Sequence, residues 1–275
     1  MSMLNQMDRR LTILADGDRV SGYARAKLTG TERLGLYPSL FMLDLWNLSE
    51  EDYLLLSRCR GVTVKNREAV LVSGIVSDAF RESTKKGTEA HIAVSPGLDL
   101  WEATVSVSVE AGVSVSETVR QLLEASGTGI PLLGFPGEDP VNTRGQAYFG
   151  RAAECIEEAL GKVGAGCCLV PSGLCVIPKE GLPVSMVLTG EDLMDTPTYT
   201  SGGEMVLRTE LAGWTLGKGV EVRYGKTRCR GLITERMLNL DTGKGPWRAE
   251  LVVDVTQYLS NTRTVTGRND RNRYS

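Results

Sequence analysis

The stretch GVEVRYGKTRCRGLI (Gly219–Ile233), followed by WRAELVVDV (Trp247–Val255), decides the fold, because earlier parts of the 275-residue chain resemble both pieces. The first piece has a counterpart in GVTVKNREAVLVSGIV (Gly61–Val76), and the second has one in WEATVSVSV (Trp101–Val109). The matches in the first pair are Gly61, Val62, Val64, Lys65 and Gly74 with Gly219, Val220, Val222, Arg223 and Gly231, with a one-residue length difference between the glycines. The matches in the second pair are Trp101, Ala103, Val105, Val107 and Val109 with Trp247, Ala249, Leu251, Val253 and Val255, without a gap. The chain therefore contains a repeated β-unit.

Each copy predicts a β-hairpin and a further strand. In the earlier copy, Gly61–Lys65 and Val70–Val76 are joined by a polar turn, and Trp101–Val109 closes the unit. Apolar and polar residues alternate strictly in that last stretch, which favours a strand with one dry and one wet face. Before the second hairpin, Gly203–Leu211 corresponds more loosely to Phe41–Leu48.

A different composition begins at Gly112. Val113–Ser126 and Arg151–Val163 have the spacing of amphipathic helices, and Cys167–Val170 with Leu174–Ile177 predicts a hairpin. The predicted fold class is α+β, mainly β, with two β-domains flanking a small α/β domain. The predicted boundaries are 1–110 for the first β-domain, 111–190 for the α/β domain, 191–255 for the second β-domain and 256–275 for a basic, flexible tail.

Composition excludes several classes of protein. The chain is 41 % hydrophobic and 24 % charged with a net charge of −3, which implies no general affinity for nucleic acid or membrane surfaces. The N-terminus lacks the pattern of a signal peptide, and no apolar run reaches the roughly 18 residues that span a bilayer. We expect a soluble protein made in the cytosol, in which the six cysteines are mostly buried thiols.

No stretch predicts a catalytic, cofactor or metal site. The sole histidine, His91, excludes mechanisms and metal sites that need two, and its local sequence offers no nucleophile and orienting acid. The hairpin would bring the cysteines at 167, 168 and 175 together, but no C-x-x-C spacing occurs. The glycine-rich stretches 127–137 and 161–166 do not lie between a strand and a helix N-terminus, as a phosphate loop must. The acidic clusters Glu50–Asp52 and Glu157–Glu158 read as solvated helix positions.

The C-terminal tail is the one strongly basic segment. It contains a single acidic residue, Asp270, and the arginines Arg263, Arg268, Arg271 and Arg273. Low hydrophobicity favours a disordered, solubilising terminus, and contact with an acidic partner or nucleic acid stays open as the alternative.

In the order of its elements, the chain resembles the baseplate hub proteins of contractile-tailed phages and related phage-tail-like particles. The resemblance covers roughly residues 10–255 and rests on strand, hairpin and linker motifs. These are a strand leading into a short helix (Leu40–Leu48), a G-x-x-V…G-x-I hairpin (Gly61–Val76), a linker and helix opening the middle domain (Thr104–Gly127), a glycine-bounded helix and hairpin (Gly145–Ile177) and a strand pair (Gly203–Val222). The chain is shorter than many hubs, and the arginine-rich end has no family counterpart.

The resemblance implies a structural, non-enzymatic protein without a cofactor. Hubs of this type form homotrimers in which each subunit contributes two tail-tube-like β-barrel or sandwich domains. The resulting pseudo-hexameric ring adapts the sixfold tail tube to the threefold central spike. The implied partners are the tail tube protein, the spike protein and other baseplate proteins, and DNA passes through the lumen without specific binding. The implied location is the virion tail baseplate, assembled in the host cytoplasm.

Ring formation would require strands that pair with neighbouring subunits, through heterologous contacts between unlike domains. The candidates are the two alternating strands, whose polar faces could line the lumen or the exterior. These faces comprise Glu102, Thr104, Ser106 and Ser108 in one strand and Arg248, Glu250 and Asp254 in the other.

Two other readings remain open. One is a cell-wall-degrading tail enzyme, which the lone histidine and the absence of a paired catalytic motif disfavour. The other is a different tube-like tail component, such as a tube initiator, which would be a hexamer with one barrel domain per chain. The internal repeat disfavours that arrangement.

Overall fold

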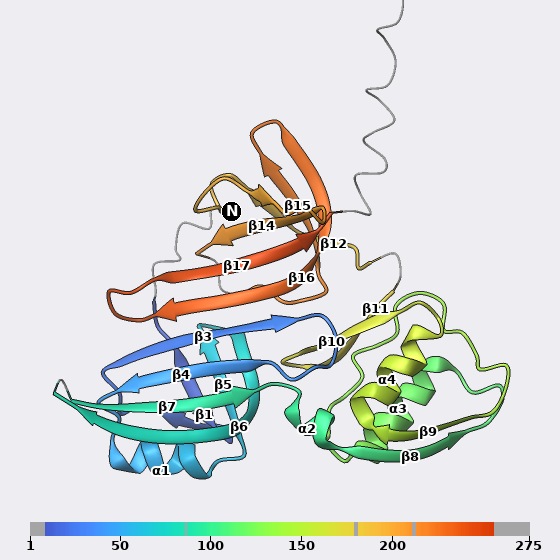
Figure 1. Cartoon of the computed structure of the whole chain (residues 1–275), viewed down its shortest axis with the longest axis horizontal. Coiled ribbons are helices and arrows are strands. Elements are labelled where there is room, and N and C mark those ends of the chain that lie inside the picture. The colour runs from blue at the N-terminus through green and yellow to red at the C-terminus, as the bar shows by residue number, and fades with distance from the viewer. Residues whose placement is uncertain (1–8, 86, 179–180, 211–212, 256–275) are drawn as a thin grey trace, which may run out of the picture.

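The structure of the chain is a computed structural model, and it describes residues 9–85, 87–178, 181–210 and 213–255 (Figure 1). The arginine-rich tail predicted from the sequence lies outside the described residues. No helix within the described residues is long and apolar enough to cross a membrane.

The first part of the chain forms a β-unit with one covering helix. Its elements are β1 (Thr12–Ala15), β2 (Asp18–Val20), β3 (Arg25–Arg33), β4 (Leu40–Trp46), α1 (Glu50–Arg58), β5 (Gly61–Asn66), β6 (Ala69–Thr84) and β7 (Gly87–Ser95). Ser49 caps α1 by accepting a hydrogen bond from Asp52 N, as its place before three acidic residues predicts. The helix contributes Leu56 to the core under β6.

The middle of the chain packs as an α/β segment beside the first β-unit (Figure 1). Its elements are α2 (Leu98–Glu102), β8 (Thr104–Val109), α3 (Val115–Ser126), β9 (Gln146–Arg151), α4 (Ala152–Gly161), β10 (Gly166–Val170) and β11 (Gly173–Ile177). The helix α3 begins at its Ser114 cap and ends at Gly127, which has a left-handed conformation. One face of α3 and of α4 is buried between the helices and the β8–β9 hairpin, which gives this segment a hydrophobic core of its own.

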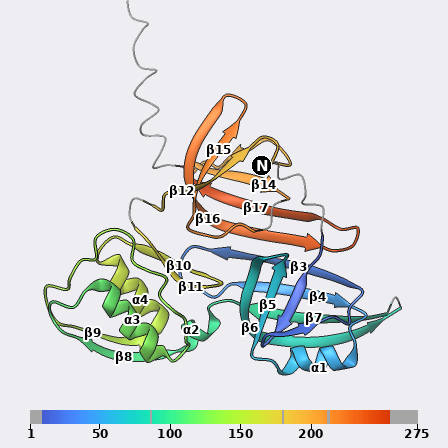
Figure 2. The same cartoon turned by 180° about the vertical axis from the view of Figure 1, so that it is seen from behind.

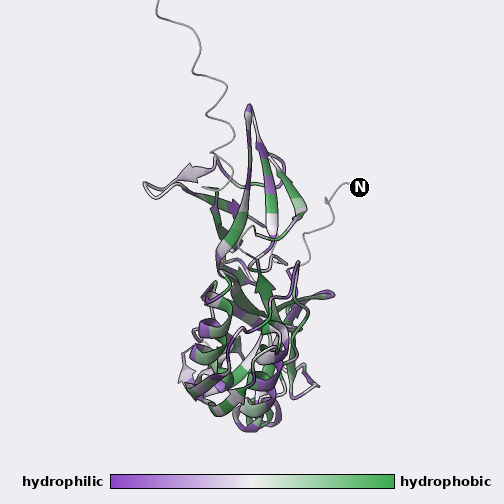
Figure 3. Cartoon of the chain, turned by 90° about the vertical axis from the view of Figure 1, so that its right-hand side faces the viewer, coloured by the Kyte–Doolittle hydropathy of each residue, from purple (hydrophilic) through white to green (hydrophobic). Residues whose placement is uncertain are grey.

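The last part of the chain is a second β-unit. Its elements are β12 (Val184–Thr189), β13 (Thr198–Tyr199), β14 (Glu204–Thr209), β15 (Gly219–Tyr224), β16 (Thr227–Asp241) and β17 (Trp247–Asp254). Alternate side chains are buried along β14 and β17, and both hydrophilic and hydrophobic segments occur along the strands of the chain (Figure 3).

The two β-units share one sheet. Among the described residues, a 13-stranded sheet runs from β13 through β14, β17, β16, β3, β4, β7, β6, β5 and β1 to β2, with β15 attached to β16 and β12 attached to β15. The units meet where β16 and β3 pair side by side, as seen from both sides of the molecule (Figures 1 and 2). One hydrophobic core cluster extends across both units.

The hairpin repeat predicted from the sequence is confirmed by the strand register. In the β5–β6 hairpin Val62 pairs with Gly74, and in the β15–β16 hairpin Val220 pairs with Gly231. The one-residue length difference is a β-bulge in the earlier copy. Val64 pairs with Val72 and Lys65 with Val70, so that Leu71 is the additional residue.

A second bulge recurs at the same place in both copies, three residues after the matched glycine. Ser77 bulges between β6 and β7, and its Oγ donates to Ala93 O at 3.3 Å. Thr234 bulges between β16 and β17, and its Oγ1 donates to Val252 O at 3.3 Å. The repeat therefore includes side-chain hydrogen bonds as well as backbone register.

Close backbone contact explains the matched glycines. A Cβ at Gly74 would lie 2.5 Å from Pro96 N, and a Cβ at Gly231 would lie 2.4 Å from Asp254 O. Both positions therefore exclude a side chain unless the backbone shifts.

The predicted match between Trp101–Val109 and Trp247–Val255 is wrong. Trp101 lies in the short helix α2, and β8 pairs with β9 in a separate two-stranded sheet. The counterpart of β17 is β7, because β7 pairs with β6 and β4 as β17 pairs with β16 and β14. Alternation shows that a strand has one dry face, but it does not show which core receives that face.

The looser match between Gly203–Leu211 and Phe41–Leu48 is confirmed. Phe41 of β4 pairs with Val94 of β7, and Met205 of β14 pairs with Val253 of β17. The helices predicted in the middle segment are α3 and α4 with slightly shorter bounds, and the strand β9 before α4 was not predicted.

Candidate functional site

The junction between β3 and β16 is the feature that unites the two copies. It is an antiparallel ladder that runs from Arg33 opposite Glu235 to Lys27 opposite Asp241. Ion pairs stand near both ends, with Arg33 Nε 2.7 Å from Glu235 Oε2 and Arg25 Nε donating to Asp241 Oδ1 at 2.8 Å. Hydrogen bonds from Arg25 hold the pKa of Asp241 below its usual value.

On the core side of the junction, Arg236 of β16 is almost fully buried, with 2 % of its side chain exposed. Its Nε lies 2.9 Å from Glu32 Oε1 of β3. Its terminal nitrogens donate to Leu71 O at 2.6 Å and to Trp214 O at 2.5 Å. Burial raises the pKa of Glu32, and the positive charge of Arg236 opposes that shift. Arg236 therefore connects strands of both units around one buried charge pair.

The bulge at Leu71 has a structural use. Because Leu71 is the residue without a partner in the β5–β6 ladder, its carbonyl is free to accept the hydrogen bond from Arg236. The additional residue of the earlier hairpin thus contacts the later copy. Sequence comparison located the additional residue only as a length difference.

Two strand edges lie at positions related to the junction. In the second unit, one edge of β16 pairs with two strands in succession. The first half of that edge pairs with β15, and the second half pairs with β3. In the first unit, β6 carries β5 in the same way, but none of the described strands pairs with that edge between Asp78 and Thr84. At the far end of the sheet, β13 pairs only with β14 within the described residues.

Two exposed aromatic side chains mark these edges. Phe80 of β6 is 47 % exposed and Tyr199 of β13 is 54 % exposed. An exposed strand edge with aromatic residues is a surface that favours pairing with another chain.

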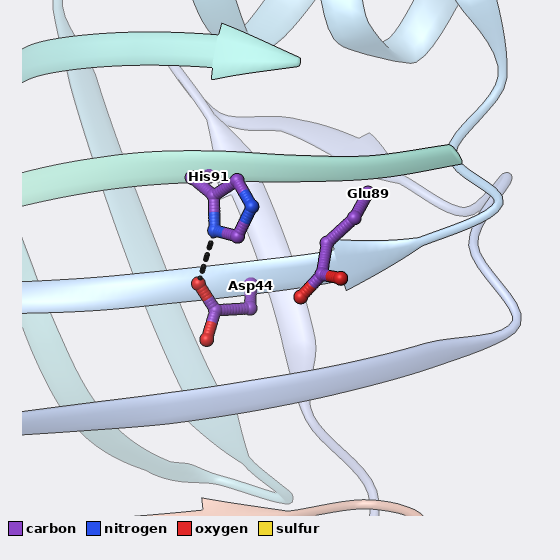
Figure 4. Close-up of side chains that lie close together, drawn as sticks. All are labelled: Asp44, Glu89 and His91. Atoms are coloured by element: carbon purple, nitrogen blue, oxygen red, sulfur yellow. Dashed lines mark hydrogen bonds and ion pairs between the residues drawn. The ribbon is translucent and has the colours of Figure 1, made fainter. Parts of the chain in front are cut away.

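His91 is accompanied by two acids that the sequence analysis missed (Figure 4). Its Nδ1 lies 2.8 Å from Asp44 Oδ1 of the neighbouring strand β4, and Glu89 projects on the same side from its own strand. The Phe80 ring stacks on the imidazole with centroids 4.6 Å apart. Asp44 lies 47 residues from His91 in the chain, so only strand pairing brings the orienting acid to the histidine.

Cys168 and Cys175 are directly opposite in the β10–β11 hairpin, as expected, whereas Cys167 points to the other side and pairs with Val176. All six cysteines have free thiols. Burial raises the pKa of Cys167 to about 12, whereas the neighbouring Cys168 thiol lowers the pKa of Cys175. Cys168 is fully buried and Cys175 is partly buried, and both pack against the hydrophobic core of the β-units.

The acidic clusters have structural partners. Asp52 accepts a hydrogen bond from Gly22 N at 2.7 Å, and Glu50 pairs with Arg81. Glu157 accepts from Leu36 N at 2.8 Å and so holds α4 to the first unit, while Glu158 pairs with Lys162. On β17, Glu250 pairs with Arg208 of β14 at 2.7 Å on the solvent side of the sheet. The predicted polar face of Thr104, Ser106 and Ser108 is exposed, but on the β8–β9 hairpin.

The chain is similar in structure to several phage-tail proteins. The tail protein from Neisseria meningitidis MC58 matches with a TM-score of 0.65 and 11 % identity, over 90 % of this chain and 96 % of that one. The E. coli c3393 protein, a type VI secretion component with structural similarity to the T4 bacteriophage tail proteins gp27 and gp5, matches with a TM-score of 0.67 and 10 % identity, over 90 % and 78 %. The 43 kDa tail protein of prophage MuSo2 from Shewanella oneidensis matches with a TM-score of 0.63 and 11 % identity, over 90 % and 98 %.

No family model matches the sequence, and no curated protein matches it significantly. The structural matches nevertheless span almost the whole described chain, including both β-units. This chain therefore has the fold of phage-tail proteins, and the resemblance predicted from its sequence is confirmed at the level of the fold.

Proposed function

We propose that this chain is a structural baseplate hub subunit. Three copies form a pseudo-hexameric ring that adapts a sixfold tail tube to a threefold central spike. The observation that carries the proposal is the β3–β16 junction, in which two copies of one β-unit pair edge to edge within a single chain. The same kind of contact, made between chains, would extend the sheet.

The strand pairing supports a specific contact. Because β4, β7 and β6 correspond to β14, β17 and β16, the counterpart of β3 is β13. The open edge of β6 corresponds to the edge of β16 that β3 occupies. In the proposed ring, β13 of one chain therefore pairs with β6 of the next, as β3 pairs with β16 inside each chain.

The correspondence also predicts the register. Thr29 opposite Asn239 and Gly30 opposite Leu238 are the internal pairs. Their counterparts across the proposed contact are Thr198 opposite Glu82 and Tyr199 opposite Arg81. The contact would cover the exposed Tyr199 and bring its ring to an arginine that already lies 5.6 Å from the ring of Tyr53.

Such a ring alternates first and second units, so three chains supply six units. Each contact is heterologous, and closure leaves no free strand edge at these positions. The proposed partners are further copies of this chain, the tail tube, the central spike and other baseplate proteins. The proposed location is the virion tail baseplate, with DNA passing through the lumen. We propose no enzymatic activity. We propose the same order of four parts as the predicted 1–110, 111–190, 191–255 and 256–275, with the first two boundaries moved so that β8 joins the middle segment and β12 joins the second β-unit.

Imaging of the assembled baseplate tests the function. We expect three copies of this chain in one ring between tube and spike. Six copies in the ring, or a location in the sheath or capsid, would refute the hub. Peptidoglycan lysis that a single acidic or cysteine substitution abolishes would favour a cell-wall-degrading enzyme.

Cysteine cross-linking in the assembled particle tests the contact. Glu82→Cys with Thr198→Cys should join neighbouring chains and give a ladder that ends at three chains. The matched control, Thr29→Cys with Asn239→Cys, occupies the internal junction and should cross-link within one chain. A three-chain ring without the cross-link between chains would reject this register and leave the hub intact.

A further inference from the structure

A cluster of ionisable side chains gathers on the solvent face of β4, β7 and β6. The potential ligand atoms of Asp44, Glu89 and His91 all lie within 4.8 Å of one another (Figure 4). We propose that these three residues form a binding site for a divalent cation of the Zn²⁺ class. The site does not depend on the proposed hub function.

Strand geometry builds this cluster. Asp44 and His91 are directly opposite in the antiparallel β4–β7 pair, and Glu89 lies two residues before His91 on the same face. Across β7, Glu82 of β6 stands directly opposite Glu89. Two like charges at directly opposite positions destabilise a sheet, so this arrangement favours a counter-charge between the strands.

The basic side chains next to the cluster are directed elsewhere. Lys27 is opposite Asp44 on β3, but among the described residues no ion pair within 4.0 Å joins the two. The Glu89 carboxylate helps to raise the pKa of Arg25, but the Arg25 guanidinium donates hydrogen bonds to Asp241 and lies over the Trp46 ring. Three carboxylates, those of Asp44, Glu82 and Glu89, thus surround one imidazole.

The imidazole is held in a fixed orientation. Phe80 stacks on the ring with an interplanar angle of 22°, and Asp44 contacts Nδ1. Two ligands about 2.1 Å from a tetrahedral metal lie about 3.4 Å apart, so the 2.8 Å between Nδ1 and Asp44 Oδ1 would lengthen by about 0.6 Å on metal binding. A metal ion would replace the proton in this contact, and Glu89 would supply the third ligand.

The ligand set indicates the class of metal. One imidazole nitrogen with two carboxylates suits Zn²⁺ and similar transition metals better than Mg²⁺ or Ca²⁺, which prefer oxygen alone. His91 and Asp44 retain 16 % and 15 % side-chain exposure, which permits exchange with solvent and leaves water to complete the coordination. The competing arrangement is a protonated His91 that pairs with Asp44 without a metal.

His91 is the sole histidine of the chain, so its imidazole nitrogens can be observed by NMR without assignment ambiguity. The test titrates ZnCl₂ into the ¹⁵N-labelled full chain, freed of metal by chelation, and repeats the titration with MgCl₂. We expect a saturable shift of the His91 Nδ1 signal with one equivalent of Zn²⁺ and none with Mg²⁺. Affinity should fall at least tenfold in Asp44→Asn and in Glu89→Gln, and should be unchanged in the matched control Asp78→Asn on β6.

Zn²⁺ that binds without moving the His91 signals would be held by cysteines, and that result would overturn the site. A His91 signal that responds to pH but not to Zn²⁺ would also overturn it, in favour of the protonated pair. If Asp44→Asn proved unfolded by circular dichroism, Glu89→Gln would decide alone, since Glu89 lies near the start of its strand and is only partly buried.

Discussion

Arg236 offers the sharpest test of how the two β-units are joined. Replacing it with Met keeps most of the side-chain volume but leaves the largely buried Glu32 carboxylate, whose side chain is 15 % exposed, without its partner. The carbonyls of Leu71 and Trp214 also lose their donor. Removing one member of a buried ion pair costs about 3–5 kcal/mol. For a chain of this size, that corresponds to a fall in Tm of about 6–20 °C.

Thermal and urea unfolding followed by circular dichroism measure this loss. The matched control is Arg33→Met at the same junction. The Arg33 side chain is 74 % exposed in its ion pair with Glu235, so its loss should cost less than about 1 kcal/mol. Adding Glu32→Gln to Arg236→Met should restore part of the stability, because the unpaired charge is then absent.

The direction of the pH effect is also determined. Burial already raises the pKa of Glu32, and removal of Arg236 raises it further. A carboxyl with a raised pKa takes up a proton more readily in the folded state, so Arg236→Met should regain stability as pH falls below that pKa. Equal losses in Arg236→Met and Arg33→Met, or no recovery on acidification, would refute the buried pair as the link between the units.

Three further predictions concern the repeat and the sheet. Gly74→Ala should lower the free energy of unfolding by about 1–3 kcal/mol, because its Cβ would lie 2.5 Å from Pro96 N. Gly61→Ala, whose Cβ would have its nearest contact at 3.5 Å, should change it by less than about 0.5 kcal/mol. Equal losses for the two variants in urea unfolding would contradict this. Thr234→Val should cost about 0.5–1.5 kcal/mol, and Ser77→Ala should cost at least as much, because Ser77 Oγ also lies 2.9 Å from Ser95 Oγ; a smaller cost for Ser77→Ala in urea unfolding would argue against equivalent bulges. The pKa of Asp241 is lowered in the folded state, so its contribution to stability is present above about pH 4 and is lost as the pH falls through the folded pKa. Asp241→Asn should therefore lower Tm at pH 7 and reduce the fall of Tm on acidification. An unchanged dependence of Tm on pH would refute this.

Local patterns predicted the hairpins and the helices of the middle segment. A β-hairpin depends on residues close in sequence, so the spacing of Val62 and Gly74 recurs visibly at Val220 and Gly231. Helix periodicity and the Ser114 cap are equally local. The order of these elements was enough to indicate a phage-tail fold, because order does not depend on how the strands pair at long range.

The tertiary structure alone decided which elements pair across long distances. Alternation in Trp101–Val109 was taken for the closing strand of the first unit, yet β8 belongs with β9, and β7 closes the sheet. The contacts of His91 with Asp44 and of Arg236 with Glu32 likewise join strands that are remote in sequence. A residue pattern specifies which face of a strand is dry, whereas the partner of that strand is chosen by the free energy of the whole packed core.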